Sequence, residues 1–298
     1  MHSGILLLDK PGGLSSNAAL QRVRALLERV KAGHVGTLDP LATGMLPICL
    51  GEATKVAGDI LAGRKRYRFT LALGAQTATG DAGGAVTGRA PVPPLEPAAI
   101  ARVLAQFLGP RQQVPPMYSA LKRGGQPLYR LARAGVTLER APRMIELTEL
   151  RLAAPARAAS LELETLCSKG TYIRVLAEEI AVALGTLGHV GSLRRLYVEP
   201  FEHATMCSLE SLAETRARGA WPALLPADFP LRNLPAVRLA AEDARRVLNG
   251  QPLTIHVPAA PTRVRLYDES GSFLGIGEAG AAGVLRPRRL LNFAPATV

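Results

Sequence analysis

The segment GHVGTLDPLATG, residues 33–44, strongly constrains the backbone, because three glycines and a proline surround its single acidic residue, Asp39. Glycine admits backbone conformations that a Cβ would forbid, and Pro40 fixes its own φ while disfavouring helical geometry at Asp39. The pattern therefore predicts a shaped loop that presents the Asp39 carboxylate. An ordinary Asp-Pro turn on the surface has the same composition. The spacing alone leaves both interpretations open.

Periodicity on either side of this loop predicts one mixed α/β domain. Short apolar runs bounded by turn residues are typical of buried strands, and apolar residues at helical spacing are typical of helices packed against a sheet. We predict strands at 4–8, 64–73 and 160–166, a further buried segment at 45–50, helices at 18–31 (ended by Gly33), 97–108 and 171–184, and a Gly- and Thr-rich loop at 74–88. In the last of these helices, Arg174 is expected in the first turn and off the buried stripe.

The strand predicted at 64–73 alternates at period two, so that Tyr67 shares an apolar face with Phe69, while Arg66 and Arg68 occupy the other face. A core position is the ordinary interpretation of Tyr67. Tyr67 also lies at the basic entrance of this strand, where an aromatic ring can stack on a base. The pattern therefore leaves two roles open for Tyr67.

The charge of the chain points to a polyanionic partner, of which nucleic acid is the commonest, since the net charge is +12 and the pI is near 10.2. Cysteines at 49, 167 and 207 are odd in number and far apart, so no disulfide framework or metal-ligand spacing follows. A reducing cytoplasm is the expected compartment. The N-terminus lacks the basic region and cleavage site of a signal peptide, and no apolar run is long enough to span a bilayer.

Residues 112–143 break the globular pattern, because basic side chains and tyrosines are interleaved there. Such a segment suits contacts with an RNA backbone and with bases, although an ordinary solvated insertion has a similar composition. We predict that this insertion binds RNA through a set that includes Lys122, Arg123, Arg130 and Arg133.

A proline-rich stretch at 222–235 has no clear periodicity and predicts a domain boundary near Leu231, which gives domains of 1–231 and 232–298. The second domain should hold a helix at 241–248 followed by brief strands separated by glycines. Its basic edge would be formed by Arg286, Arg288 and Arg289.

Several classes of site are excluded or lack support. The run GIGEAG at 275–280 satisfies G-x-G-x-x-G, but neither a substantial helix nor a suitably placed acidic residue follows, so dinucleotide binding is rejected. No P-loop is present. The histidines at 189, 203 and 256 show no metal-ligand spacing. We therefore expect neither a metal nor a cofactor.

Separate segments of the chain resemble, in the same order, the motifs of the TruB family of tRNA pseudouridine synthases. The resemblance covers essentially the whole chain, and it rests on DKP at 9–11, GHVGTLDPLATG at 33–44, RKRYRF at 64–69, TATGDAGG at 77–84, SKGTYIR at 168–174 and HVGSLRRL at 189–196. One departure is Ala78, which stands where many members have aspartate; it lies outside the core chemistry.

The resemblance implies an α+β pseudouridine-synthase domain, with residues 112–143 as a thumb-like insertion that clamps the T arm, followed by a small PUA-like β-barrel. It implies that uridine at position 55 of the tRNA T loop is isomerised to pseudouridine without a cofactor. Asp39 would be the nucleophile, Arg174 would pair with it, and Tyr67 would pack against the target uridine. No obligatory protein partner and a monomeric state are expected.

Further site residues follow from the same resemblance. Tyr172 would lie in the uridine pocket and Leu193 against the uracil, although ordinary core packing is equally compatible with Leu193. His34 would occupy the space vacated by the flipped nucleotide. Lys10, in the turn that resembles the family's first motif, is a candidate for the substrate site, but a structural role is favoured.

Two other functions compete with this one. An RNA chaperone would bind and refold tRNA without catalysis, and both activities could coexist in one protein. A glycosidase usually needs two carboxylates that flank one bond, and no second acidic residue accompanies Asp39 in its loop.

Overall fold

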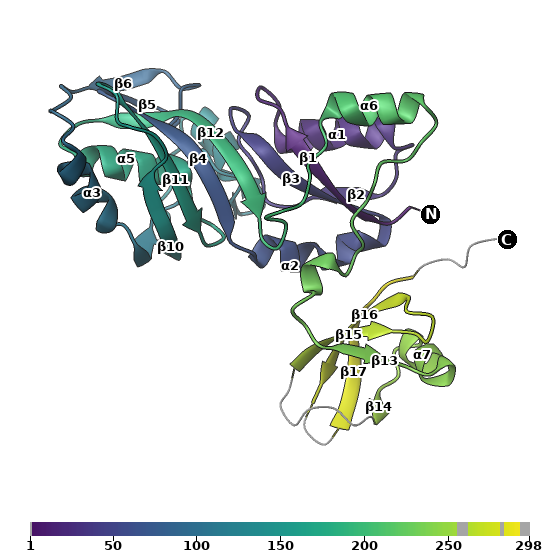
Figure 1. Cartoon of the computed structure of the whole chain (residues 1–298). Coiled ribbons are helices and arrows are strands. Elements are labelled where there is room, and N and C mark those ends of the chain that lie inside the picture. The colour runs from purple at the N-terminus through teal and green to yellow at the C-terminus, as the bar shows by residue number, and fades with distance from the viewer. Residues whose placement is uncertain (1, 255–261, 281–282, 293–298) are drawn as a thin grey trace.

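The computed structural model describes residues 2–254, 262–280 and 283–292, and it consists of a larger N-terminal body and a smaller C-terminal body (Figure 1). The elements of the larger body are β1 (Gly4–Lys10), α1 (Ser16–Leu26), β2 (Ala32–His34), β3 (Thr43–Leu50), the 3-10 helix η1 (Gly51–Val56), α2 (Ala57–Ala62), β4 (Lys65–Leu73), β5 (Ala75–Thr77), β6 (Val86–Arg89), α3 (Pro97–Ala105), β7 (Gly109–Gln113), β8 (Lys122–Arg123), β9 (Gln126–Pro127), α4 (Leu128–Arg133), β10 (Arg143–Leu152), β11 (Ser160–Cys167), α5 (Ile173–Ala183), β12 (Gly188–Val198), α6 (Leu209–Ala217) and the 3-10 helix η2 (Phe229–Leu231). Those of the smaller body are β13 (Ala236–Arg238), α7 (Ala241–Leu248), β14 (Leu253–Thr254), β15 (Thr262–Tyr267), β16 (Phe273–Ala279) and β17 (Val284–Leu290). The expected α+β class is confirmed.

The larger body is built on a sheet that has eight strands within the described residues. Seven of them follow the order β1-β3-β12-β4-β11-β10-β7, and β2 pairs with β3 outside this path. Its pairs are antiparallel except for β3 and β12, which meet in parallel where Gly44 lies beside Arg195. Gly44 has a φ of +97°, and a Cβ there would overlap the carbonyl oxygen of Arg195, so this close approach of two strands requires glycine. This parallel contact fixes the end of the 33–44 loop against β12.

The two faces of this sheet have different surroundings. Helices α1, α3, α5 and α6 cover one face, where Phe69 and Leu71 of β4 belong to a continuous apolar core. On the other face, β1 and β3 pack against η1 and α2 and against the C-terminal body. The fold therefore places the 33–44 loop at the junction of β3, β12 and the helical layer.

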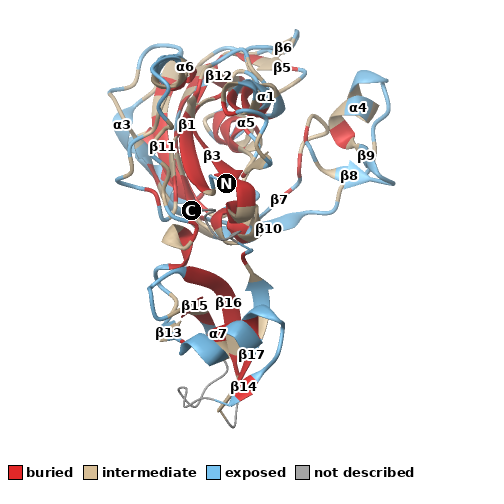
Figure 2. Ribbon diagram, turned by 90° about the vertical axis from the view of Figure 1, so that its right-hand side faces the viewer, coloured by how far each residue is buried: buried red, intermediate tan, exposed pale blue. Residues whose placement is uncertain are grey.

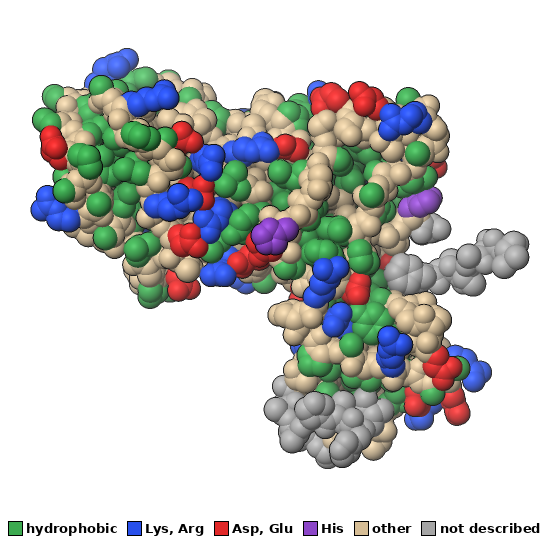
Figure 3. Space-filling view, in the orientation of Figure 1, with side chains coloured by type: hydrophobic (Ala, Val, Ile, Leu, Met, Phe, Trp, Pro, Cys, Tyr) green, Lys and Arg blue, Asp and Glu red, His purple; other side chains and the backbone are tan. Residues whose placement is uncertain are grey.

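The part of the second face that lies over β4, β10 and β11 carries charged side chains. Glu164 is buried there and accepts hydrogen bonds from Arg66, Arg68 and Arg151, each at 2.8–3.0 Å. On the face turned to the viewer in Figure 3, basic and acidic side chains are intermixed over the larger body. The charges on these strands are thus largely paired.

Both boundaries predicted for the first helix are wrong, and the helix predicted at 97–108 ends earlier, at Ala105. The helix predicted at 18–31 starts at Ser16, with Ser15 as its cap, and ends at Leu26. The exposed residues Glu28 and Arg29 then take φ values of 54° and 55°, which reverse the chain without a glycine at a cost of about 1–2 kcal/mol per residue. Gly33, expected to end the helix, lies in β2 instead.

The segment predicted as loop at 74–88 contains regular structure. Strands β5 and β6 form a short antiparallel hairpin in which Ala75 pairs with Arg89. Its Gly- and Thr-rich turn masked the pattern, because a three-residue strand is too short to show an alternation. Asp81 lies in this turn.

Residues 112–143 form a lobe that projects from the sheet between β7 and β10 (Figure 2). It contains the small hairpin β8–β9 and the helix α4, and backbone bonds from Leu128 N to Leu121 O (2.7 Å) and from Tyr129 N to Ser119 O (3.1 Å) hold it together. Most of its side chains are exposed, and Leu128 is its buried apolar anchor.

The C-terminal body has, in its described part, a five-stranded sheet in the order β13-β15-β16-β17-β14 with α7 beside it. The predicted helix at 241–248 is confirmed as α7. The GIGEAG run lies largely in β16 and opens no helix among the described residues. Contacts with the larger body include the ion pair of Arg263 with Asp59, at 2.7 Å.

The three cysteines, Cys49, Cys167 and Cys207, are free thiols. Burial raises the pKa of the first two to about 12, so they are unreactive. Among the described residues, none of the helices has the length and apolar character needed to cross a membrane.

Candidate active site

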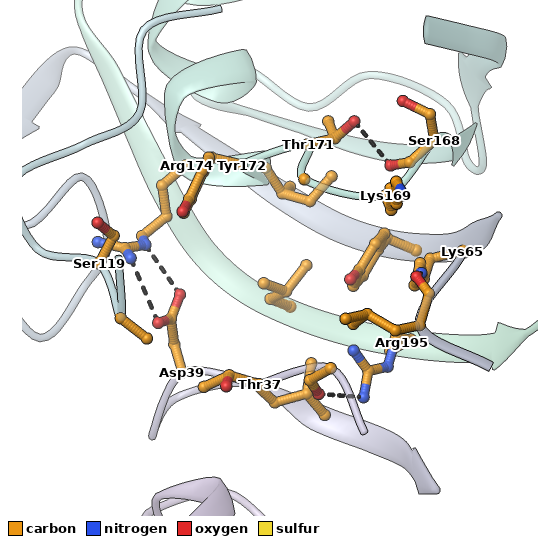
Figure 4. A pocket seen from close by; sticks show the side chains of 18 of the residues that line it. Thr37, Asp39, Lys65, Ser119, Ser168, Lys169, Thr171, Tyr172, Arg174 and Arg195 are labelled. Carbon is orange, nitrogen blue, oxygen red and sulfur yellow. Dashed lines mark hydrogen bonds and ion pairs between the residues drawn. The ribbon is translucent and has the colours of Figure 1, made fainter. Parts of the chain in front are cut away.

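A cavity of about 330 Å³ opens between the 33–44 loop, the base of the 112–143 lobe and the N-terminal end of α5 (Figure 4). The residues that line it come from segments far apart in the sequence: 36–39, Leu61 of α2, Lys65 and Tyr67 of β4, 119–121, the turn and helix start 168–174, and Leu193 and Arg195 of β12. Among these described lining residues, Asp39 is the only carboxylate.

Asp39 and Arg174 face one another across this cavity as an ion pair. The Nε atom of Arg174 lies 2.9 Å from Oδ2 of Asp39, and Nη2 donates to Oδ1 at 3.3 Å. Burial raises the pKa of Asp39, and the positive charge of Arg174 opposes this rise. The pair therefore favours the ionised form of a carboxylate that its surroundings would otherwise neutralise.

The guanidinium of Arg174 also connects two loops. Its Nη1 donates to Thr79 O at 2.6 Å in the β5–β6 turn, and Nη2 donates to Tyr118 O at 2.7 Å in the 112–143 lobe. Asp81 Oδ2 lies 3.8 Å from Nε. Arg174 lies off the apolar stripe of its helix, as expected, but it is only 5% exposed because its side chain enters the cavity.

The 33–44 loop is fixed by bonds that do not use the Asp39 carboxylate. Ser16 Oγ accepts from Leu38 N at 2.7 Å and is 2.9 Å from Leu38 O, to which it donates. Ala42 N donates to Asp39 O at 3.1 Å. Arg195 Nη2 donates to Gly36 O at 2.9 Å. The carboxylate is thus presented from a fastened loop, as the glycines and the proline predict.

Three other predicted residues lie in the cavity wall. Tyr67 is 9% exposed and belongs to the apolar core, and it also lines the cavity. A core position and a position beside a bound base are therefore compatible for this residue. Leu193 is similarly buried at the wall. Tyr172 precedes α5, and its backbone N–H donates to Gln113 at 2.8 Å. Their contacts with uridine stay predictions.

Lys10 and His34 do not line this cavity. The Nζ of Lys10 is buried and donates to Pro11 O at 2.7 Å, to Leu14 O at 2.6 Å and to Pro40 O at 3.4 Å. Burial lowers the pKa of Lys10 to about 8. These contacts tie the first turn to the 33–44 loop and fit a structural role. His34 lies in β2, and burial lowers its pKa.

The residues predicted to bind RNA outside the cavity are exposed. Lys122 and Arg123 lie in β8, and Arg130 and Arg133 lie in α4. Arg133 is placed over the ring of Tyr129, 5.7 Å from its centroid.

In the C-terminal body, Arg286 and Arg288 are exposed on β17, as a basic edge requires. Arg288 Nε lies 2.6 Å from Glu278 Oε2, so part of the charge of this edge is already compensated. Contact of this edge with RNA stays a prediction.

Sequence reasoning missed two buried cations of the cavity wall, Lys65 and Arg195, and the exposed Lys169. The alternation contains the signal, because Lys65 lies two positions before Tyr67 and Arg195 two positions after Leu193, so each cation shares a face with a wall residue. In the sheet, Arg195 lies directly opposite Tyr67. Asp81, beside Arg174, was also missed as a site residue.

No group of side chains suited to hold a metal ion occurs in the described part of the chain. His189 Nδ1 is 2.8 Å from Ala75 O, so this ring nitrogen already has a hydrogen-bond partner in the protein. His256 lies outside the described residues.

Three protein-family profiles together match nearly the whole chain. The profile described as TruB family pseudouridylate synthase (N-terminal domain) matches residues 24–173. The tRNA pseudouridylate synthase B C-terminal domain matches 174–230, and the C-terminal domain of pseudouridine synthase II TruB matches 235–291.

Curated relatives match over almost their full length. The tRNA pseudouridine synthase B of Chromohalobacter salexigens is 49% identical over 293 residues, which cover 98% of this chain and 95% of the relative. The protein of the same name from Stutzerimonas stutzeri is 48% identical over 296 residues, with 97% and 96% covered.

Solved structures show a similar fold at low sequence identity. A chain from a Cbf5-Nop10-Gar1 complex has a TM-score of 0.71 and 24% identity, and the match covers 94% of this chain and 79% of that one. A chain from an H/ACA RNP bound to a substrate RNA containing 2′-deoxyuridine has a TM-score of 0.72 and 21% identity, with 98% and 86% covered. These two likenesses concern the fold. Because the family profile matches residues 24–173 and the relatives are 48–49% identical over nearly their full length, the chain belongs to the TruB family of pseudouridine synthases.

Proposed function

We propose that this protein isomerises uridine to pseudouridine in tRNA, at position 55 of the T loop, with Asp39 as the catalytic carboxylate. The observation that carries the proposal is the single carboxylate among the described residues of the cavity, Asp39, held by the guanidinium of Arg174 at 2.9 Å. The full-length relatives named tRNA pseudouridine synthase B support tRNA as the substrate.

The reaction fits this arrangement. The C1′–N1 bond must break, the uracil must turn, and C5 must join C1′, while the C5 proton is lost and N1 gains a proton. The product is an isomer, so no electrons enter or leave. One ionised carboxylate can act as the nucleophile or can stabilise positive charge on the sugar. Asp39 supplies it, and Arg174 keeps it ionised.

The cavity can receive a base that has left its stack. Tyr67 and Tyr172 offer aromatic surface, and Leu193 offers an apolar contact. Stacking on an aromatic side chain returns roughly 1–3 kcal/mol, which offsets part of the unstacking energy of a flipped base. We propose that these three residues hold the target uridine, and that His34 enters the space that it leaves.

The direct test is incubation of the protein with an unmodified T-arm hairpin, followed by chemical mapping of pseudouridine. We expect modification of one uridine, at the position equivalent to 55, and no product from a matched hairpin that carries cytidine there. Absence of product from the first hairpin, with RNA binding intact, would contradict the proposal and leave refolding by binding alone. No particular contact in the described part of the structure favours that chaperone function.

The finer organisation is part of the same proposal. We place the domain boundary near Leu231, with a catalytic domain of 1–231 and a PUA-like RNA-binding domain of 232–298 that uses Arg286 and Arg288. We infer that residues 112–143 clamp the T arm, that the protein works as a cytoplasmic monomer, and that it needs no metal or cofactor.

The clamp can be tested by salt dependence. Replacing Arg130 and Arg133 of the exposed helix α4 by glutamine should weaken binding of the T-arm hairpin, because each lost phosphate contact lowers the slope of log affinity against log salt by roughly 0.7–0.9. The slope is measured by titrations at several salt concentrations. Arg218→Gln, an exposed position after α6, is the control and should leave the slope unchanged. An unaltered slope in the double variant would show that α4 does not contact the RNA backbone.

A further inference from the structure

The cavity wall contains a buried cation that the proposed roles do not use. Arg195 is 1% exposed, which makes it one of the most completely buried large side chains of the described chain. It lies opposite Tyr67 in the register of β12 and β4, and it lines the same cavity as Asp39.

The acceptors of Arg195 are neutral. Its Nε donates to Met45 O at 2.7 Å and its Nη2 to Gly36 O at 2.9 Å, and within the described residues it has no salt bridge to a carboxylate. Lys65 on the neighbouring strand is in the same situation, because its Nζ donates to Leu61 O at 2.6 Å and to Gly63 O at 2.5 Å. Two buried cations therefore lie on one wall without a described carboxylate between them.

On the other face of β4, by contrast, the arginines are paired with a carboxylate. Arg66 and Arg68 alternate with Lys65 and Tyr67, and both contact Glu164 within 3.0 Å. A buried ion without a counter-ion costs several kcal/mol. Lys65 is an example of this cost. Its pKa is lowered to about 8, mainly by burial and secondly by the positive charge of Arg195. A negative charge brought by the substrate would compensate it.

The charges of the cavity are also separated in space. Figure 4 shows Asp39 and Arg174 at one end, where they neutralise one another, and Arg195, Lys65 and Lys169 toward the other end. Tyr67, which lies directly opposite Arg195 in the sheet, and Leu193 also line the cavity, and the base is proposed to lie against them. With the sugar held at Asp39, a base in contact with Tyr67 would lie toward the cations.

We propose that Arg195, assisted by Lys65, stabilises the negative charge of the uracil while it is detached from the sugar. The inference rests on the proposed function. When C1′–N1 breaks, N1 keeps the electron pair and the uracil becomes an anion, while C1′ carries the positive charge that Asp39 opposes. When C5 attacks C1′, the C5 proton leaves, N1 is protonated, and the charges cancel again. Preorganised donors aimed at a developing charge act without reorganisation at the moment of reaction.

The test compares two leaving groups in single-turnover reactions. T-arm hairpins carry either uridine or 5-fluorouridine at the target position, and loss of the starting nucleoside is followed. Fluorine withdraws electrons and stabilises the uracil anion, so the fluorinated base needs less help. Arg195→Met should slow the uridine reaction by about 100-fold or more and the 5-fluorouridine reaction by less than about tenfold. The affinity for either hairpin should stay within about threefold of the parent.

Three controls make this comparison specific. Arg68→Met removes an arginine from the opposite face of β4 and should leave both rates unchanged, because Glu164 keeps two other arginines. Arg174→Lys should slow both substrates by similar factors, since it acts on Asp39 rather than on the base. Arg195→Lys retains the cation and should recover at least about tenfold of the uridine rate lost in Arg195→Met.

Each other outcome overturns the inference. Equal slowing of both substrates by Arg195→Met would mean that Arg195 only shapes the loop through Gly36 O. Weakened RNA binding with unchanged rates would mean that it contacts a phosphate. If Arg195→Met does not fold, Lys65→Met takes its place with the same expected pattern, and Arg195→Lys no faster than a variant without the cation contradicts the proposal. Failure of the parent to convert uridine would instead refute the proposed function.

Discussion

Replacement of Asp39 by asparagine is expected to abolish pseudouridine formation while leaving the affinity for a T-arm hairpin within about twofold of the parent. The amide is similar in size but carries no negative charge and no nucleophilic carboxylate oxygen. It can neither form a covalent adduct nor oppose positive charge on the sugar. Product is measured by chemical mapping over long incubations, and affinity is measured by titration at one salt concentration.

The structure explains why this variant should still bind RNA. The 33–44 loop is fastened by Ser16, by the Asp39 backbone carbonyl and by Arg195, none of which contacts the Asp39 carboxylate. Arg174 keeps its bonds to Thr79 O and Tyr118 O, so the base of the 112–143 lobe stays in place. The exposed basic residues are unaltered.

This experiment needs a control variant and a check for deamidation. Glu162→Gln removes a partly exposed carboxylate on the opposite side of the sheet, 3.9 Å from Arg68, and should have full activity. Deamidation of the introduced asparagine back to aspartate must be excluded by mass spectrometry. Clear product from a verified Asp39→Asn protein would remove Asp39 from the catalytic role.

The loop around Asp39 could be predicted from sequence because glycine and proline act on the local backbone. Gly36 takes a φ of +72° and Gly44 a φ of +97°, conformations that follow from residue type rather than from distant contacts. The strand at 64–73 was equally accessible, since its alternation extends over nine residues, Lys65–Leu73. Local rules failed where exposed non-glycine residues, Glu28 and Arg29, turned the chain.

The composition of the site could be predicted only in part. The Asp39–Arg174 pair joins residues 135 positions apart, and no periodicity links them, so only the family resemblance indicated the pair. Helical spacing predicts which apolar residues are buried, and it placed Arg174 off the apolar stripe, but it has no rule that indicates the burial of an arginine against a polar cavity. For Lys65 and Arg195 the alternation placed a cation on an apolar face, which is the pattern to look for in other chains.

Replacement of Arg174 by lysine is expected to lower the turnover number by about 100- to 1,000-fold while RNA affinity changes by less than about threefold. Lysine keeps one positive charge but has no planar fork. Arg174 uses its fork for two contacts with Asp39 and for one each with Thr79 O and Tyr118 O. A single ammonium cannot reach all of these acceptors, so the carboxylate loses its orientation. Steady-state rates and hairpin titrations measure the two effects separately.

The pH dependence of the same position distinguishes orientation from charge. Burial raises the pKa of Asp39, and Arg174 lowers it, so removal of the cation must raise it further. Activity that needs the ionised carboxylate rises with pH through this pKa, and the acid limb of the rate profile should therefore move to higher pH in Arg174→Met. It should move less in Arg174→Lys, which keeps the charge. Arg111→Lys, which alters the ion pair with Glu179 on the same helix, is the matched control and should shift neither rate nor limb. If Arg174→Lys has activity within a few-fold of the parent and Arg174→Met leaves the limb in place, the guanidinium does not govern Asp39, and the carboxylate must be held ionised by Lys10 and the remaining charges around the loop.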